Sequence, residues 1–212
     1  MRYFRDLRDK INRRLDKLKT PHRDMQINEY PWLYGALGQV PSDVMFICEN
    51  PSLAGVAKAH VDTIDGRDPD IEAQWWDGPN SSCRKRFRPV LCQMGLKTSP
   101  PDAPGGWKCY ITNVVKEANV AGADQGKKTP QERRKQARDW ADILRWEWDQ
   151  VRPQHVFCVG GASFEAVKRL QREGLLPDFN PDKMWHYSAR GRDEDVKKKM
   201  LGPLQKALGS GT

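Results

Sequence analysis

Three apolar runs of the sequence end on polar side chains that together could hold a polar, planar ligand and activate water. Glu49 and Asn50 follow the first run, Asn113 ends the second, and His186 with Ser188 follows the third. A carboxylate can act as a general base on water, and an imidazole can stabilise developing negative charge. A carboxamide both donates and accepts hydrogen bonds, so Asn113 can pair with the edge of a nucleobase.

Each of these residues also has an ordinary structural explanation. Asn113 could satisfy backbone groups at a strand-to-loop turn, and spacing alone slightly favours that role. Glu49 and Asn50 could form a polar turn after a buried strand, with Pro51 restricting Asn50 to an extended or turn conformation in either case. His186 could be a buried histidine that is satisfied by hydrogen bonds.

The polar residues can meet only if the apolar runs are strands of one sheet. Strands are predicted at 43–48, within 107–115, at 155–159 and in a short segment that ends near 184–186. Helices are predicted between them, at about 83–94, from a capping box at Thr129 and Glu132 through Trp148, after Gly160 and Gly161, and at about 193–208.

This alternation predicts an α/β fold with three αβα layers and a central four-stranded parallel sheet, in which ligands bind at the carboxyl ends of the strands. We expect a single domain over 1–212, with 1–20 a basic N-terminal helix that has a narrow apolar stripe. Residues 61–82 are predicted to form a long working loop. Gly160 and Gly161 resemble a phosphate-binding turn, but the spacing of a dinucleotide fingerprint is absent, which favours tight strand-to-helix packing.

The chain is basic, with 36 Lys and Arg against 28 Asp and Glu in 212 residues, a formal charge of +8. The basic side chains cluster in 1–23, 84–88 and 190–199. Solvated helix faces would explain any one cluster, whereas three modestly favour a phosphate-backbone partner. No apolar stretch is long enough to span a membrane, and the first residues lack a secretion signal, so we expect a soluble, cytoplasmic protein.

The five cysteines are widely spaced and include no C-x-x-C pair. The spacing excludes a dense disulfide framework and argues against a zinc or iron–sulfur site, so we expect reduced thiols, no metal and no cofactor.

Taken in order, the three segments resemble the uracil-DNA glycosylase superfamily, and in particular its family-four-type members. Residues 46–52 (FICENPS) resemble the first motif, and 110–116 (YITNVVK) closely resemble the strand whose asparagine recognises uracil. Residues 186–190 (HYSAR) resemble the histidine, proline, serine motif and the side chain behind it that enters the DNA stack. Order and separation also fit, and the resemblance covers about 43–200.

The resemblance implies a monofunctional hydrolase of base-excision repair that cleaves the bond between deoxyribose and uracil, or another deaminated base, flipped out of DNA. Glu49 or Asn50 would place the water, Asn113 would recognise the pyrimidine edge, and His186 would stabilise charge on the base. An aromatic side chain should stack on the base, with Trp75, Trp76 and Phe87 as candidates, although core packing is the commoner role of such residues. The implied base-binding residues are Cys48, Pro51, Ser52, Asn113 and Trp76, and the implied DNA-binding residues are Ser188, Arg190, Arg192, Lys116, Arg84 and Arg86.

The sequence departs from the family pattern in four places. Cys48 replaces a glycine, Asn50 makes the first motif a hybrid of two branches, and Tyr187 replaces the proline of the third motif. The cysteines that hold an iron–sulfur cluster in family-four members are missing, and the basic N-terminal helix could replace the structural contribution of that cluster. The departures keep an alternative open, a catalytically weak or inactive superfamily member that binds nucleic acid or damaged bases without cleavage. In either case we expect a monomer.

Overall fold

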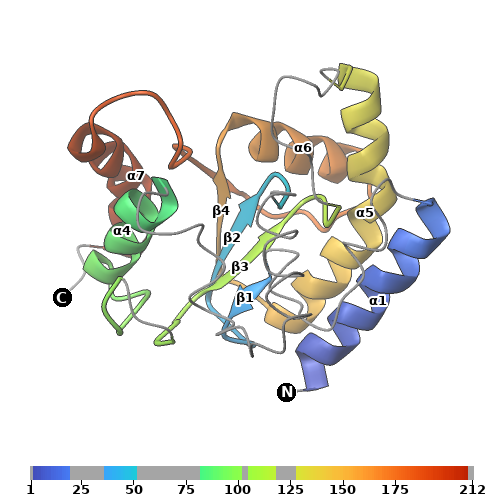
Figure 1. Ribbon diagram of the computed structural model, residues 1–212, viewed down its shortest axis with the longest axis horizontal. Coiled ribbons are helices and arrows are strands. Elements are labelled where there is room, and N and C mark those ends of the chain that lie inside the picture. Colours follow the sequence, from blue (N-terminus) through green and yellow to red (C-terminus); the bar gives the residue numbers. More distant parts are fainter. Residues whose placement is uncertain (1, 20–35, 52–81, 102–104, 118–127, 210–212) are drawn as a thin grey trace, which may run out of the picture.

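A five-stranded, mostly parallel sheet forms the centre of the computed structural model, which describes residues 2–19, 36–51, 82–101, 105–117 and 128–209 (Figure 1). The strand order is β1-β3-β2-β4-β5. The strands are β1 (Leu37–Gly38), β2 (Val44–Cys48), β3 (Tyr110–Asn113), β4 (His155–Val159) and β5 (Asp182–Met184). The helices are α1 (Arg2–Leu18), η2 (Cys83–Phe87), α4 (Arg88–Gln93), α5 (Pro130–Val151), α6 (Gly161–Arg172) and α7 (Asp193–Leu208).

The four predicted parallel strands are confirmed, and a fifth strand is added to them. β3, β2, β4 and β5 pair in parallel, whereas β1 pairs with β3 antiparallel at the sheet edge. β1 has only two residues, too few for a recognisable apolar pattern. A Cβ at Gly38 would lie 2.0 Å from the carbonyl oxygen of Cys109, so the close approach of this strand requires glycine.

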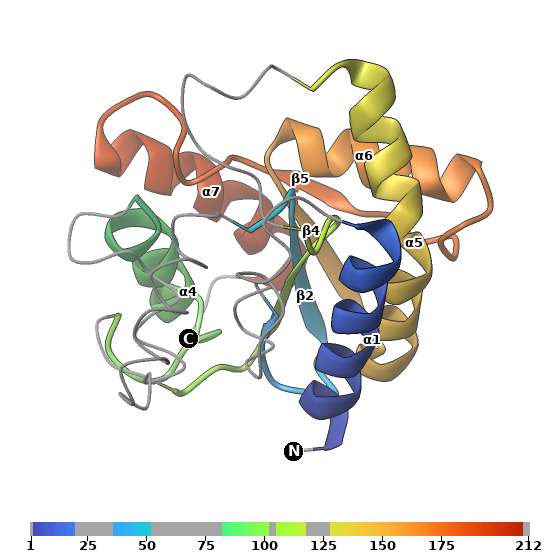
Figure 2. The same ribbon diagram turned by 45° about the vertical axis from the view of Figure 1, so that its right-hand side comes forward.

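Helices cover both faces of the sheet, which confirms the three-layer αβα architecture (Figures 1 and 2). One apolar cluster joins one face of the sheet to α1, α5 and α6, and the other joins the opposite face to η2, α4 and α7. β2 is buried along its whole length, as its continuous apolar run predicts. The sheet is therefore held between two apolar cores.

The predicted helix start at Thr129 is confirmed as a capping box. The Glu132 N–H donates to Thr129 Oγ1 (3.2 Å), and the Thr129 N–H donates to the Glu132 carboxylate (2.6 Å). The predicted helix at 83–94 is also present, but its first part is a π-helix, and it becomes α-helical at Arg88, next to Pro89. Proline lacks an N–H and cannot make the hydrogen bond of a helix interior, and Pro89 lies where the π-helix gives way to α4.

The N-terminal helix is packed into the domain rather than projecting from it. Leu7, Ile11 and Leu15 are fully buried in the cluster that α1 shares with α5. Figure 2 shows α1 lying along α5. In the described part of the chain, no helix is both long and apolar enough to cross a membrane.

Candidate active site at the strand ends

The ends of β2 and β3 lie side by side and bring two of the predicted motifs together. Cys48 pairs in register with Asn113. The pairing continues beyond the strands, where the Val114 N–H donates to the Cys48 carbonyl (2.8 Å) and the Val115 N–H donates to the Glu49 carbonyl (3.0 Å). The Glu49 carboxylate and the Asn113 carboxamide therefore follow the carboxyl ends of two neighbouring strands, on the same side of the sheet.

The third motif reaches the carboxyl ends of the strands through β4 and β5. The Gly160 N–H donates to the Met184 carbonyl (2.8 Å), so the turn after β4 lies next to the end of β5. A Cβ at Gly160 would lie 3.1 Å from His186 Cδ2, and the φ of Gly160 is 95°. The glycine thus gives His186 room beside the strand ends. The predicted tight packing at Gly160 is present, and the side chain packed against it is that of His186.

His186 is held as a neutral imidazole with a defined tautomer. The backbone N–H of Ser188 donates to His186 Nδ1 (3.1 Å), and Ser188 Oγ lies 2.6 Å from the same atom. Because Nδ1 accepts, the proton of the neutral ring is on Nε2, which can donate to a ligand. Burial lowers the pKa of His186 from its ordinary value of 6.5, since the charged form loses hydration.

Tyr187, which replaces the proline of the third motif, packs between His186 and the core. Its ring centroid lies 4.2 Å from that of His186 and 5.7 Å from that of Phe87, on which it stacks. Phe87 in turn contacts Phe46 of β2 edge to face, at 5.3 Å. These aromatic contacts connect the His186 loop to β2. The smaller ring of a proline at position 187 could not make the contact with Phe87.

The first motif forms a half-buried turn after β2. The Asn50 Nδ2 group donates to the Pro51 carbonyl (2.9 Å), so part of the carboxamide is committed to the turn. Cys48 is buried, and burial raises the pKa of its thiol to about 12, which keeps it protonated at neutral pH. Glu49 is half-buried beside it and is the carboxylate of this turn.

A buried ion pair lies directly behind Asn113. The side chains of Lys116 and Glu147 are both fully buried and form a salt bridge with each other. Lys116 also donates to the Asn113 carbonyl (2.7 Å) and to Thr112 Oγ1. Burial lowers the pKa of Lys116, and Glu147 opposes that effect. Lys116 cannot reach a DNA phosphate from this position, so its prediction as a DNA-binding residue is wrong.

The ion pair belongs to a network that begins on α1. The Tyr3 hydroxyl donates to the Tyr110 hydroxyl (2.7 Å), and Tyr110 donates to Glu147 Oε1 (2.6 Å), which also accepts from Thr112 (2.7 Å). Burial and the Glu147 charge raise the pKa of Tyr110 well above 10. Hydrogen bonds thus connect α1, β3 and α5 to the backbone of Asn113.

Sequence analysis missed this network although one signal for it was available. The core-facing positions of α5 are apolar except Glu147, which lies three residues after Leu144 and four before Val151. An acidic side chain on an apolar helix face needs a buried partner. Its partner Lys116 is far away in the sequence, and only the fold brings the two together.

Arg86 supports the loop of the third motif from η2. Its guanidinium donates to the Tyr187 and Ala189 carbonyls (3.0 and 2.7 Å), to the Gly191 carbonyl (3.0 Å) and to the Asp193 carboxylate (2.7 Å). These bonds use four of the five guanidinium N–H donors. Arg86 therefore shapes the loop beside His186, and its contact with DNA stays a prediction.

The other predicted residues have varied positions. Arg190 and Arg192 are exposed on the loop before α7, and Arg192 forms a surface ion pair with Asp195 (2.9 Å). Arg84 is half-buried on η2. Phe87 is fully buried, so it packs in the core, the role that sequence analysis considered the commoner one. Ser52, Trp75 and Trp76 lie outside the described residues.

The described residues do not provide a metal site. No group of three or more His, Cys, Asp or Glu side chains among them could hold a metal ion. All five cysteines are described, and none is in a disulfide bond. The five thiols are not gathered into one group, which is the arrangement that an iron–sulfur cluster needs.

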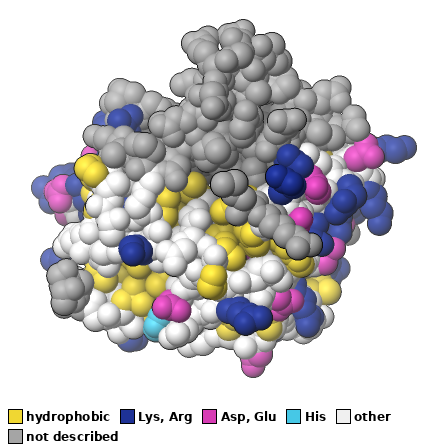
Figure 3. Space-filling model, turned by 90° about the horizontal axis from the view of Figure 1, so that it is seen from below, with side chains coloured by type: hydrophobic (Ala, Val, Ile, Leu, Met, Phe, Trp, Pro, Cys, Tyr) yellow, Lys and Arg dark blue, Asp and Glu magenta, His cyan; other side chains and the backbone are white. Residues whose placement is uncertain are grey.

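Charge is dispersed on the face opposite the strand ends. Figure 3, seen from below Figure 1, shows basic side chains singly or in small groups, with acidic and apolar side chains between them. No continuous basic surface covers the visible part of that face.

A comparison with protein-family models relates the chain to a known superfamily. The sequence model of the uracil DNA glycosylase superfamily matches residues 36–204, which include all three strand-end motifs. No curated protein matches the chain.

Proposed function

Because the chain belongs to the uracil DNA glycosylase superfamily, we propose that it hydrolyses the N-glycosidic bond of uracil, or another deaminated base, in DNA. The base would be flipped out of the duplex into the strand-end site. The product would be a free base and an abasic site, with no strand cleavage by the protein itself.

The observation that carries this proposal is that the three motifs meet at the carboxyl ends of the strands. Cys48 pairs with Asn113 in register, and His186 packs against Gly160 at the end of the neighbouring strand. A carboxylate, a carboxamide and a neutral imidazole therefore extend from adjacent strand ends, the set of groups that base hydrolysis needs.

The roles follow from the chemistry of each group. The Asn113 side chain would pair with the pyrimidine edge. The hydrogen bond from Lys116 to the backbone carbonyl of Asn113 supports the position of this residue. The bond from C1′ to the base nitrogen would break with its electron pair passing to the base, and water oxygen would bond to C1′. His186 would donate its Nε2 proton in a hydrogen bond to the base oxygen on which charge develops.

Glu49 is the better candidate for the residue that positions the water. The side-chain Nδ2 group of Asn50 donates a hydrogen bond to the Pro51 carbonyl, and this contact stabilises the turn. The carboxylate of Glu49 could accept a proton from the attacking water, which a carboxamide cannot do.

The test is an incubation of the full chain with single- and double-stranded oligonucleotides that contain one uracil, followed by alkali to break the strand at abasic sites. We expect breaks at uracil, a loss of about 10²-fold or more in rate for His186→Ala, and altered base preference for Asn113→Asp. Binding without breaks on uracil, hypoxanthine and xanthine substrates would instead support the non-cleaving alternative.

A further inference from the structure

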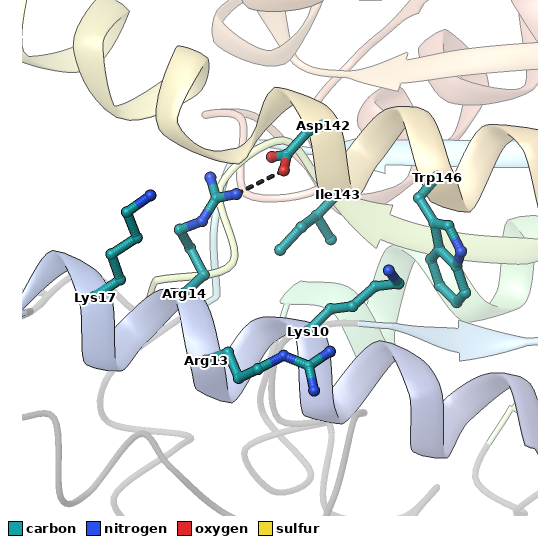
Figure 4. A pocket seen from close by; sticks show the side chains of 7 residues that line it. All are labelled: Lys10, Arg13, Arg14, Lys17, Asp142, Ile143 and Trp146. Carbon is teal, nitrogen blue, oxygen red and sulfur yellow. Dashed lines mark hydrogen bonds and ion pairs between the residues drawn. The ribbon is translucent and has the colours of Figure 1, made fainter.

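A basic groove lies between α1 and α5, away from the strand-end site. It encloses about 280 Å³ and is lined by Lys10, Arg13, Arg14 and Lys17 on α1 and by Asp142, Ile143 and Trp146 on α5 (Figure 4). Four cations and one carboxylate give its walls a net charge of +3. We infer that this groove binds the phosphate backbone of DNA at a second site, remote from the flipped base.

Helical spacing places the cations on one strip of α1. Positions 10, 13, 14 and 17 are separated by three, four and seven residues, so their side chains share one face of the helix. At 1.5 Å per residue, Lys10 to Lys17 spans about 10 Å, the axial length of about three phosphates of one DNA strand. The strip therefore matches a polyanion better than a single small anion.

The groove is rigid because its two helices are fixed to each other. Leu7, Ile11 and Leu15 are fully buried below it. Arg14 donates to the Asp142 carboxylate (2.6 Å) and to the backbone carbonyl of Asp139. Arg14 thus serves mainly as a link between the helices, and the other three cations are the ones assigned to phosphate contacts.

Trp146 closes one end of the groove without offering a free ring face. Tyr3 stacks on its ring (5.1 Å between centroids, 7° between planes), and Lys10 Nζ lies 5.1 Å from the ring centroid. A ring in these two contacts is poorly placed to stack on a nucleobase. The groove should therefore bind the backbone without preference for sequence.

The groove is separate from the strand-end site. α5 begins at the strand-end edge, because it connects the end of β3 to the start of β4. Near this beginning lies a second cavity, of about 240 Å³, whose charged lining residues are Glu117, Lys128, Glu132, Lys135 and Asp139. Its net charge of −1 interrupts the basic surface, so the groove would hold DNA away from the lesion. The choice of DNA over another polyanion rests on the proposed function.

The experiment compares two triple variants of the full chain. The groove variant carries Lys10→Gln, Arg13→Gln and Lys17→Gln, and retains Arg14 because it joins the helices. The control variant carries Arg145→Gln, Arg169→Gln and Arg172→Gln, which removes the same charge from α5 and α6 outside the groove. Circular dichroism and thermal midpoints establish that both variants are folded.

The readout is the affinity for undamaged single-stranded and duplex oligonucleotides, measured by fluorescence anisotropy over a range of salt concentrations. Three lost phosphate contacts should reduce the slope of log K against log salt by about 2 to 3 in the groove variant, and little in the control. An unchanged slope in the groove variant, or an equal reduction in both variants, overturns the inference. Undamaged DNA requires no cleavage, so a failure of the proposed glycosylase activity leaves this result interpretable.

Discussion

The buried Lys116–Glu147 pair makes a prediction that tests the internal support of Asn113. Replacing Lys116 by Met leaves the Glu147 carboxylate buried with two hydroxyl donors and no counter-charge. Removal of one partner of a buried ion pair costs about 3–5 kcal/mol, mainly because the other charge is left uncompensated. The double variant Lys116→Met, Glu147→Gln removes both charges of this pair and should regain much of that loss.

Urea unfolding measures these differences. With a slope of about 2 kcal/mol per M, a loss of 3–5 kcal/mol lowers the midpoint of Lys116→Met by about 2 M. The double variant should unfold at a higher urea concentration than Lys116→Met. Lys135→Met is the control, because it breaks an exposed ion pair with Asp139 and should shift the midpoint little.

Two outcomes would refute this reasoning. One is a midpoint of Lys116→Met close to that of the Lys135→Met control, which would mean that the pair does not stabilise the fold. The other is a double variant whose loss equals the sum of the losses of Lys116→Met and of Glu147→Gln, each measured singly, since independent effects would exclude coupling between the buried charges.

Three further predictions concern the site and the buried thiols. Gly160→Ala should destabilise the protein by about 1–3 kcal/mol, because alanine is strained at φ 95° and its Cβ approaches His186 to 3.1 Å; glycosylase activity should fall with it, and full activity would contradict the placement of His186. The pKa of His186, measured by NMR titration of the ring, should lie below 6.5, and a higher value would show that burial is not its dominant influence. The free energy of unfolding should fall as pH rises above 9, because burial raises the pKa of Cys48, Cys109 and Cys158 and these thiols therefore lose their protons at a lower pH in the unfolded chain than in the folded one. Each thiol should lower that free energy by on the order of 1 kcal/mol per pH unit. Burial lowers the pKa of Lys116 in the folded protein, so up to about pH 10.5 this group makes stability rise with pH and offsets the loss from one of the three thiols. Urea midpoints that rise from pH 9 to 10 would therefore contradict the burial of the thiols.

Local sequence signals were sufficient for most of the fold. Continuous apolar runs predict buried strands such as β2, and the capping box at Thr129 predicts the start of α5, because both depend on neighbouring residues. β1 was missed because two residues carry no periodicity. Its position depends on the close approach of Gly38 to Cys109, which is a tertiary contact.

The candidate site was predictable where a side chain follows its strand directly. Asn113 and Glu49 reach the sheet edge through the strand register alone. Lys116 and Arg86 were assigned to DNA because they are basic and close to motifs, but their surroundings come from distant segments. Glu147 of α5 buries Lys116, and four acceptors on the 187–193 loop bind Arg86. Charge in a sequence does not distinguish a surface cation from one that holds the interior together.

The packing of α1 means that the folding unit of this chain extends beyond the segment that the superfamily model matches. The matched segment begins at residue 36, yet Leu7, Ile11 and Leu15 complete its core from outside that segment. Burial of three such side chains contributes about 5–9 kcal/mol, which is comparable to the whole stability of a typical domain. A protein trimmed to the shared segment would expose one face of α5 and leave the Tyr110 hydroxyl without its Tyr3 partner, so aggregation of the shortened chain would say nothing about the competence of the strand-end site.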